Sequence, residues 1–174
     1  VSFTAESYKV LAQNPKINGV KEASGNFSLL AHTRFLCPDD FYIWSGNDDQ
    51  ITSALALGAK GVISVLANII PRETHAICQS YFDGHSDQSD TLQLRYLELI
   101  ENLFSDVNPI PVKRALNAMG FSVGGCRLPL CDMDEVAEER LLSCLHKFGL
   151  IQDKENGSVT VLRPQDALLW RKNH

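Results

Sequence analysis

The stretch Ile17-Asn18-Gly19-Val20-Lys21-Glu22-Ala23-Ser24-Gly25-Asn26 places a lysine at the end of a short apolar run. Pro15 before it and Gly25 after it bound the run, so it predicts a buried strand whose polar turn opens a helix. Burial would destabilise the ammonium of Lys21 and lower its pKa, which supplies a free amine able to attack a carbonyl. The same residues also fit a strand-end lysine that points into solvent or pairs with Glu22. This stretch alone leaves both interpretations open.

The composition fits one ordinary domain with a hydrophobic core, since the chain has 174 residues and is 44% hydrophobic. It starts at Val1 without a methionine, and Ser2 to Ser7 already resemble the cap and first turn of a helix. We therefore expect a fragment of a longer domain. The formal net charge is −5 with acids and bases interspersed, which gives no electrostatic footprint for nucleic acid or for an anionic membrane surface.

The cysteines indicate a reducing compartment. There are five, an odd number, and none is in C-x-x-C spacing, so neither a disulfide framework nor a zinc site is expected. Cys126, Cys131 and His146 lack a second pair of ligands, and no metal site is predicted. No run approaches the roughly 20 apolar residues of a membrane span, and no signal-peptide pattern is present. The sequence therefore predicts a soluble, cytoplasmic protein with reduced thiols.

Three consecutive strand–turn–helix patterns fill the first half of the chain. The strands are expected at 17–22, 41–46 and 61–67, and the helices at 26–37, 50–57 and 72–82. Units of this length predict parallel strands joined by right-handed helical crossovers, which is α/β architecture.

The pattern becomes helical after residue 85. A long amphipathic helix is expected over 92–104, a second from Pro111 to Gly120, and a third over 133–148. The pair Asn156-Gly157 then indicates a turn between two short strands, and a short helix is expected over 167–170.

Four blocks of the sequence, taken in order and spacing, resemble the dihydrodipicolinate synthase family. They are Gly19-Val20-Lys21-Glu22-Ala23-Ser24-Gly25-Asn26, Ser45-Gly46-Asn47-Asp48, Gly58-Ala59-Lys60-Gly61-Val62-Ile63-Ser64-Val65 and Asn108-Pro109-Ile110-Pro111-Val112-Lys113. The resemblance covers about residues 1–151. The wider superfamily is that of the pyruvate-dependent class I aldolases, and the first and last blocks favour the synthase within it.

The resemblance implies a (β/α)8 TIM barrel with its active site at the carboxyl ends of the strands. Residues 1–85 would be the C-terminal part of that barrel, from the fifth helix to the eighth strand–helix unit. Residues 86–151 would be a C-terminal helical region, and 152–174 a tail extension. Lys21 matches the Schiff-base lysine on the sixth strand, Gly46 a glycine that lines the pocket, and Ile63 a residue whose backbone contacts bound pyruvate.

The implied activity is that of a lyase of lysine (diaminopimelate) biosynthesis, which condenses pyruvate with L-aspartate 4-semialdehyde without metal or organic cofactor. Family members are commonly homotetramers, so a tetramer or dimer is expected. The family's proton-relay, semialdehyde-binding and carboxylate-binding residues all precede Val1, and the missing N-terminal half of the barrel becomes an expected partner. The 174-residue chain alone is expected to be inactive.

Two alternatives remain open. One is a related pyruvate aldolase, similar to N-acetylneuraminate lyase, that acts on a sugar-derived aldehyde. The other is a non-catalytic half-barrel that serves as an interaction module and keeps Lys21 without using it.

Overall fold

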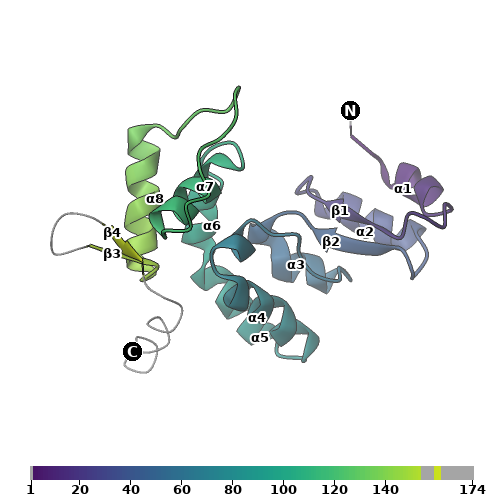
Figure 1. Cartoon of the computed structure of the whole chain (residues 1–174). Helices are drawn as coiled ribbons and strands as arrows, with labels where there is room; N and C mark the ends of the chain where they lie inside the picture. Colours follow the sequence, from purple (N-terminus) through teal and green to yellow (C-terminus); the bar gives the residue numbers. More distant parts are fainter. Residues whose placement is uncertain (1, 154–158, 162–174) are drawn as a thin grey trace. The chain divides into compact units, whose positions relative to one another are not determined.

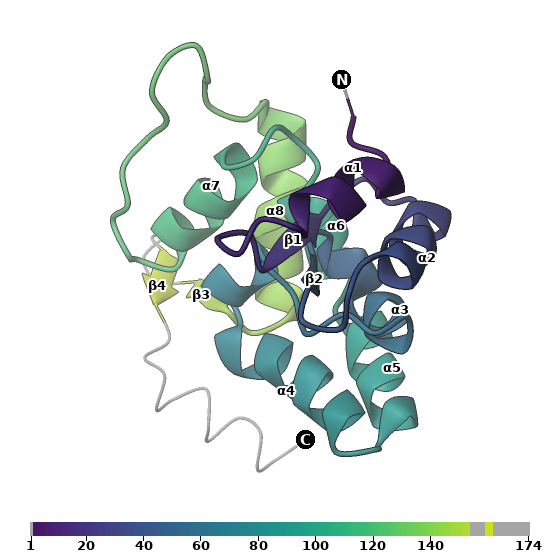
Figure 2. The same cartoon turned by 90° about the vertical axis from the view of Figure 1, so that its right-hand side faces the viewer.

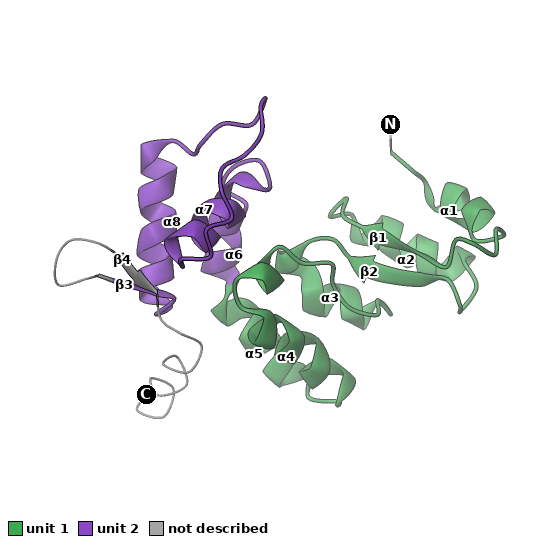
Figure 3. Cartoon of the chain, viewed as in Figure 1, with its two compact units in different colours: residues 1–96 green, residues 97–174 purple. Residues whose placement is uncertain are grey.

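The computed structural model describes residues 2–153 and 159–161. The chain divides into two compact units, residues 1–96 and 97–174 (Figure 3). The first unit is an α/β structure that contains α1 (Ala5–Leu11), β1 (Gly19–Glu22), α2 (Phe27–Leu36), β2 (Tyr42–Ser45), η1 (Asp48–Gln50), α3 (Ile51–Ala56), η2 (Leu66–Asn68), α4 (Pro71–Phe82) and α5 (Ser86–Arg95). The second contains α6 (Leu97–Leu103), α7 (Ile110–Ala118), α8 (Glu135–Lys147), β3 (Ile151–Asp153) and β4 (Val159–Val161) (Figure 1).

The sheet of the first unit confirms the predicted parallel pairing. β1 pairs with β2 in parallel, with Lys21 opposite Trp44 and Glu22 opposite Ser45. The third predicted strand, over 61–67, is wrong in extent because only a single parallel bridge, between Ser45 and Val62, forms there. The chain then turns into η2, where the Asp48 side chain of η1 accepts hydrogen bonds from the backbone amides of Val65 and Leu66.

Helices cover one face of this sheet. Alternate residues of a strand point to opposite faces, and Val20 and Ile43 point toward α2 and α3, where they pack with Leu30 and Ala54. Figures 1 and 2 both show α2 and α3 beside β1 and β2. The opposite face carries Lys21 and its cross-strand partner Trp44. Helices α2 and α3 therefore cover the face of Val20 and Ile43, and not the face of Lys21.

The start and end of several helices follow from local chemistry. The Asn26 side chain caps α2 by accepting a hydrogen bond from the amide of Leu29 at 3.1 Å, as expected for an asparagine N-cap. The end of α3 is followed by Gly58, whose φ of +90° lies in the left-handed region that favours glycine. The predicted helices 26–37, 50–57 and 72–82 are therefore confirmed to within a few residues.

The long helix predicted over 92–104 is wrong, because the chain leaves helical geometry at Tyr96. There φ is −99° and ψ is 6°, and Tyr96 ends α5. α5 packs against α4 within the first unit, where the Ser89 hydroxyl donates a 2.7 Å hydrogen bond to the Ile77 carbonyl. The two compact units therefore divide after Tyr96. The predicted end of the barrel at residue 85 stays a prediction.

The second unit contains the other predicted helices. Asp134 caps α8 by accepting hydrogen bonds from Val136 and Ala137, both at 3.1 Å. Arg114 of α7 forms an ion pair with Glu138 of α8 at 2.6 Å. β3 and β4 pair antiparallel, as the sequence predicted for two short strands. The predicted turn at 156–157 and the predicted helix over 167–170 lie outside the described residues.

Candidate functional site

Lys21 is the second-to-last residue of β1, one residue before the strand's carboxyl end. Its side chain is exposed, which contradicts the predicted burial and agrees with the alternative of a strand-end lysine that points into solvent. The physical reason is that the described helices pack on the face of Val20, whereas Lys21 points to the other face. Burial that would activate the amine must therefore come from something that covers this second face.

Gly46 lies directly against the Lys21 side chain. A Cβ atom at position 46 would stand 2.9 Å from Lys21 Cε and 2.5 Å from Ala23 Cβ, closer than non-bonded carbons approach. The Gly46 amide also donates a 2.7 Å hydrogen bond to the Glu22 carbonyl. Only a residue without a side chain fits here. The structure therefore brings Gly46 and Lys21 together at the carboxyl ends of two neighbouring strands.

Ile63 follows the single bridge that stands in place of a third strand. Its amide donates a 2.8 Å hydrogen bond to the Ser45 carbonyl, so its backbone lies beside the residue that precedes Gly46. Its side chain is 48% exposed. The three residues selected from the sequence thus lie on three adjacent segments of one sheet, in the order Lys21, Gly46, Ile63.

The turn after β2 is fixed by its own polar side chains. The Ser45 hydroxyl donates to the Asn47 carbonyl at 2.9 Å and accepts from the Asn47 amide at 3.1 Å. Asp48 is buried and binds two backbone amides of the segment after Ile63. Asp48 was not predicted from the sequence as a site residue, and its place two residues after Gly46 was the available signal.

Glu22 anchors the end of β1 on the helix-facing side. Its buried carboxylate accepts hydrogen bonds from the Ser24 amide at 2.6 Å and from the Tyr8 hydroxyl of α1 at 3.3 Å. Burial raises the pKa of the Tyr8 phenol, and the charge of Glu22 adds to that rise. Glu22 therefore pairs with α1 and with its own turn, and not with Lys21.

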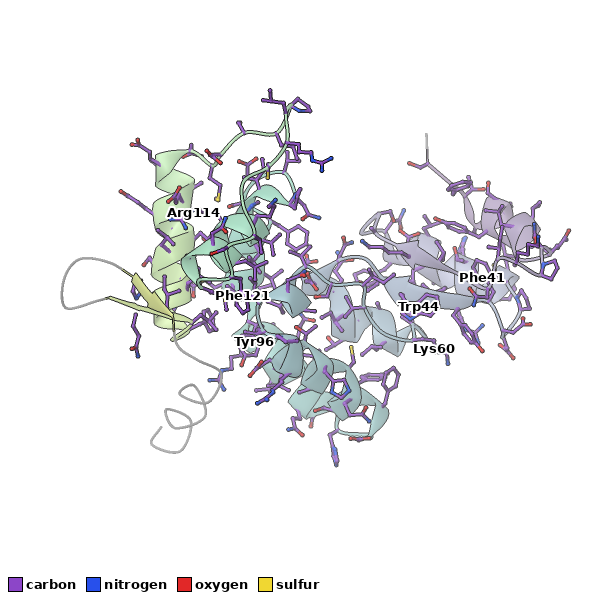
Figure 4. All side chains as sticks on the ribbon, viewed as in Figure 1. Phe41, Trp44, Lys60, Tyr96, Arg114 and Phe121 are labelled. Atoms are coloured by element: carbon purple, nitrogen blue, oxygen red, sulfur yellow. The ribbon has the colours of Figure 1, made fainter. Side chains whose placement is uncertain are left out.

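A cavity of about 320 Å³ lies between the bridge at Val62 and helix α4. Trp44 and Lys60, which Figure 4 labels near each other, belong to its lining together with Ser64, His75 and Cys78. Lys21, Gly46 and Ile63 are not among its lining residues. This cavity is therefore separate from the three predicted site residues, although Trp44 is the strand partner of Lys21.

No metal-binding cluster is evident in the part of the chain that the structure describes, since no group of three or more His, Cys, Asp or Glu side chains there could hold an ion. Within the same residues, none of the helices combines the length and apolar character needed to cross a membrane.

The chain has parallel strands joined by helices, and a lysine lies at the carboxyl end of one strand. This arrangement defines an α/β protein of the class in which active sites form at the carboxyl ends of the strands. The model of the Dihydrodipicolinate synthetase family matches residues 1–147. The chain therefore belongs to that family.

Curated relatives and solved structures agree with this assignment. The chain is 50% identical over 150 residues to the 4-hydroxy-tetrahydrodipicolinate synthase of Caldicellulosiruptor saccharolyticus, and the match covers 86% of this chain and 50% of the relative. It is 52% identical over 152 residues to 4-hydroxy-tetrahydrodipicolinate synthase 1 of Clostridium acetobutylicum, covering 87% of this chain and 52% of the relative.

Among solved structures, the dihydrodipicolinate synthase of Cyanidioschyzon merolae with lysine bound superposes with a TM-score of 0.83 at 38% identity, covering 86% of this chain and 51% of that one. The Thermotoga maritima dihydrodipicolinate synthase gives a TM-score of 0.80 at 37% identity over 83% of this chain and 50% of that one. The chain thus spans about half the length of the relatives it matches.

Proposed function

We propose that these residues are the C-terminal part of a 4-hydroxy-tetrahydrodipicolinate synthase, which condenses pyruvate with L-aspartate 4-semialdehyde. The observation that carries the proposal is the contact of Gly46 with the Lys21 side chain at the carboxyl edge of the sheet. Lys21 is the amine, and the glycine lets the chain after β2 pass directly against its side chain. Sequence identity of about 50% to enzymes of that name supports the choice of reaction.

The chemistry follows from an amine beside a keto acid. The Lys21 amine adds to the C2 carbonyl of pyruvate, and loss of water gives an imine. The protonated imine withdraws electrons, so the methyl group releases a proton and an enamine forms. The enamine carbon then bonds to the aldehyde carbon of the semialdehyde, whose oxygen takes up a proton. Attack by the substrate's own amino group closes the ring and releases Lys21. No step needs an electron acceptor or a metal.

Gly46 and Ile63 are the proposed walls of the pyruvate site. Both lie next to Ser45, since Ile63 bonds to its carbonyl and Gly46 follows it in the chain. In this proposal the backbone of Ile63 contacts the keto acid, and Gly46 lines the site beside the Lys21 side chain. Both roles require that the segment at Ile63 holds its place beside β2.

The proposal includes a partner, namely a segment that completes the barrel. Strands β1 and β2 and the bridge at Val62 would be the sixth, seventh and eighth strands. Ser45 bonds to the residues on either side of Val62, which directs the Val62 amide and carbonyl to the opposite edge, where a further strand pairs. The exposure of Lys21 supports the same conclusion, because the completing segment would cover this face and desolvate the amine. The chain alone is therefore expected to be inactive, and a cytoplasmic homo-oligomer stays a prediction.

The experiment has two parts. The full chain, co-expressed with the N-terminal half of the Clostridium acetobutylicum relative, is incubated with pyruvate and borohydride, and its intact mass is measured. One reduced pyruvate adduct per chain is expected. Consumption of L-aspartate 4-semialdehyde by the same assembly is then followed. Capture of pyruvate without consumption of the semialdehyde would contradict the synthase activity and favour a related pyruvate aldolase. A folded assembly that forms no adduct would favour the non-catalytic interaction module.

A further inference from the structure

One carboxylate joins the two segments that the proposed function places around pyruvate. Asp48 follows the Gly46 turn and is only 1% exposed. Its Oδ2 atom accepts hydrogen bonds from the amides of Val65 at 2.8 Å and Leu66 at 3.0 Å. Val65 lies two residues after Ile63, so this contact links η1, which follows β2 and Gly46, directly to the segment that carries Ile63.

The backbone of Asp48 is held from a second direction. The Gln93 side chain of α5 donates a 2.8 Å hydrogen bond to the Asp48 carbonyl and accepts one from the Ile51 amide at 3.2 Å. Gln93 is itself buried, at 5% exposure. The backbone of Asp48 is therefore held in place by Gln93. As a result its carboxylate can fix the position of residues 65 and 66.

A carboxylate at position 48 lowers the stability of the fold in one respect. Its Oδ1 atom is buried and finds no hydrogen-bond partner among the described atoms, and a buried polar atom left in that state opposes folding. A neutral acceptor would also cap two amides. A charged acceptor, however, makes shorter and stronger bonds, which matters where the position of the bound segment has to be exact.

We propose that Asp48 is a positioning residue, which holds the backbone at Ile63 in the place where it contacts the keto acid bound to Lys21. The inference rests on the proposed function, because Ile63 and Gly46 take their roles from it. It adds a residue that touches no substrate and acts through the segment 63–66.

The first test is amide hydrogen exchange on the full chain. In Asp48→Ala the amides of Val65 and Leu66 should exchange about 10- to 100-fold faster, since each loses a bond to a charged acceptor, while the Gly46 amide stays unchanged. Asp48→Asn should restore part of this protection and give exchange rates between those of Asp48→Ala and the wild type, because its amide oxygen can accept the same two bonds but carries no charge. Asp49→Ala is the matched control, since Asp49 is the exposed neighbour.

Three results of the exchange experiment would overturn the inference. They are a wild-type chain without protection at Val65 and Leu66, an Asp48→Ala chain with unchanged protection, and an Asp48→Ala chain in which all amides lose protection equally. The last would give Asp48 a general stabilising role only.

The second test measures pyruvate capture by the assembly with the N-terminal half of the relative. Asp48→Ala should raise the half-saturating pyruvate concentration about tenfold and leave the maximal trapping rate within about threefold, because Lys21 on β1 is untouched. Asp48→Asn should recover part of the loss, because its acceptor is neutral. Loosened amides with an unchanged half-saturation would overturn the link to pyruvate. A wild-type assembly that captures no pyruvate would overturn the proposed function, while the exchange result would still decide whether Asp48 fixes the segment.

Discussion

Gly46 and Lys21 are in such close contact that a single methyl group at position 46 would stand 2.9 Å from Lys21 Cε. The same methyl group would stand 2.5 Å from Ala23 Cβ. The chain just after β1 and the chain just after β2 are therefore packed too closely to admit a side chain at position 46. Substitutions in and around this contact provide direct tests of the structure.

Gly46→Ala should destabilise the chain by about 1–3 kcal/mol, because β1 and β2 must separate to admit the methyl group. Urea unfolding followed by circular dichroism measures the change. Gly125→Ala is the matched control, since a Cβ there meets nothing within 4 Å and should change the free energy of unfolding by less than about 0.5 kcal/mol. Equal stabilities of the two variants would show that the contact is looser than described.

Gln93→Ala should cost about 1–3 kcal/mol, because it leaves the buried Asp48 carbonyl and Ile51 amide without their partner. The measurement is again the free energy of unfolding. Gln88→Ala removes an exposed glutamine from the same helix and should be nearly neutral. A loss shared by both variants would indicate an effect on helix α5 as a whole.

Asp134→Ala should destabilise helix α8 by about 1 kcal/mol, because the amides of Val136 and Ala137 lose the side-chain acceptor that caps them. Glu139→Ala, an exposed substitution inside the same helix, should have little effect. Thermal unfolding of the two variants in parallel separates the loss of the cap from the loss of one surface charge.

Stability should fall at alkaline pH because of Cys144. Burial, with the charge of Glu98, raises the pKa of this thiol to about 11, whereas an unfolded cysteine has a pKa of about 8.5. Between these values the unfolded chain has released the proton that the folded chain still holds, so the free energy of unfolding decreases by up to about 1.4 kcal/mol per pH unit.

Cys144→Ala removes this contribution. Its unfolding free energy should therefore fall less steeply between pH 9 and pH 11 than that of the wild type, whatever its value at neutral pH. Urea titrations at several pH values give both slopes. Parallel slopes would mean that Cys144 titrates as an exposed thiol.

The sequence predicted the elements that are determined locally. The capping Asn26, the glycine after α3 and Pro111 near the start of α7 each mark a helix boundary, and the structure has those boundaries. It did not predict the loss of the third strand, because Asp48 lies far from Val65 along the chain and its capping contact is tertiary. The break between α5 and α6 was also missed. The helical spacing of apolar residues continues across Tyr96, and such spacing does not reveal that one residue leaves helical geometry.

The site was predictable in part, for a similar reason. The blocks around Lys21, Gly46 and Ile63 are short and contiguous, so their likeness to a family could be seen from sequence. Whether Lys21 is exposed or buried could not be decided from the sequence, because a strand's sequence says that it has two faces and not what covers each of them. Asp48 was missed because its role depends on Val65 and Gln93, which lie on other elements.

The central claim is that the amine of Lys21 forms an imine with pyruvate. The most direct test is to locate the borohydride-reduced adduct by peptide mass spectrometry, in the assembly of the full chain with the N-terminal half of the relative. We expect one adduct on the peptide that contains Lys21, its loss in Lys21→Ala, and its retention in Lys16→Ala, which removes a nearby exposed lysine. An adduct that survives in Lys21→Ala, or that lies on another lysine, would contradict it.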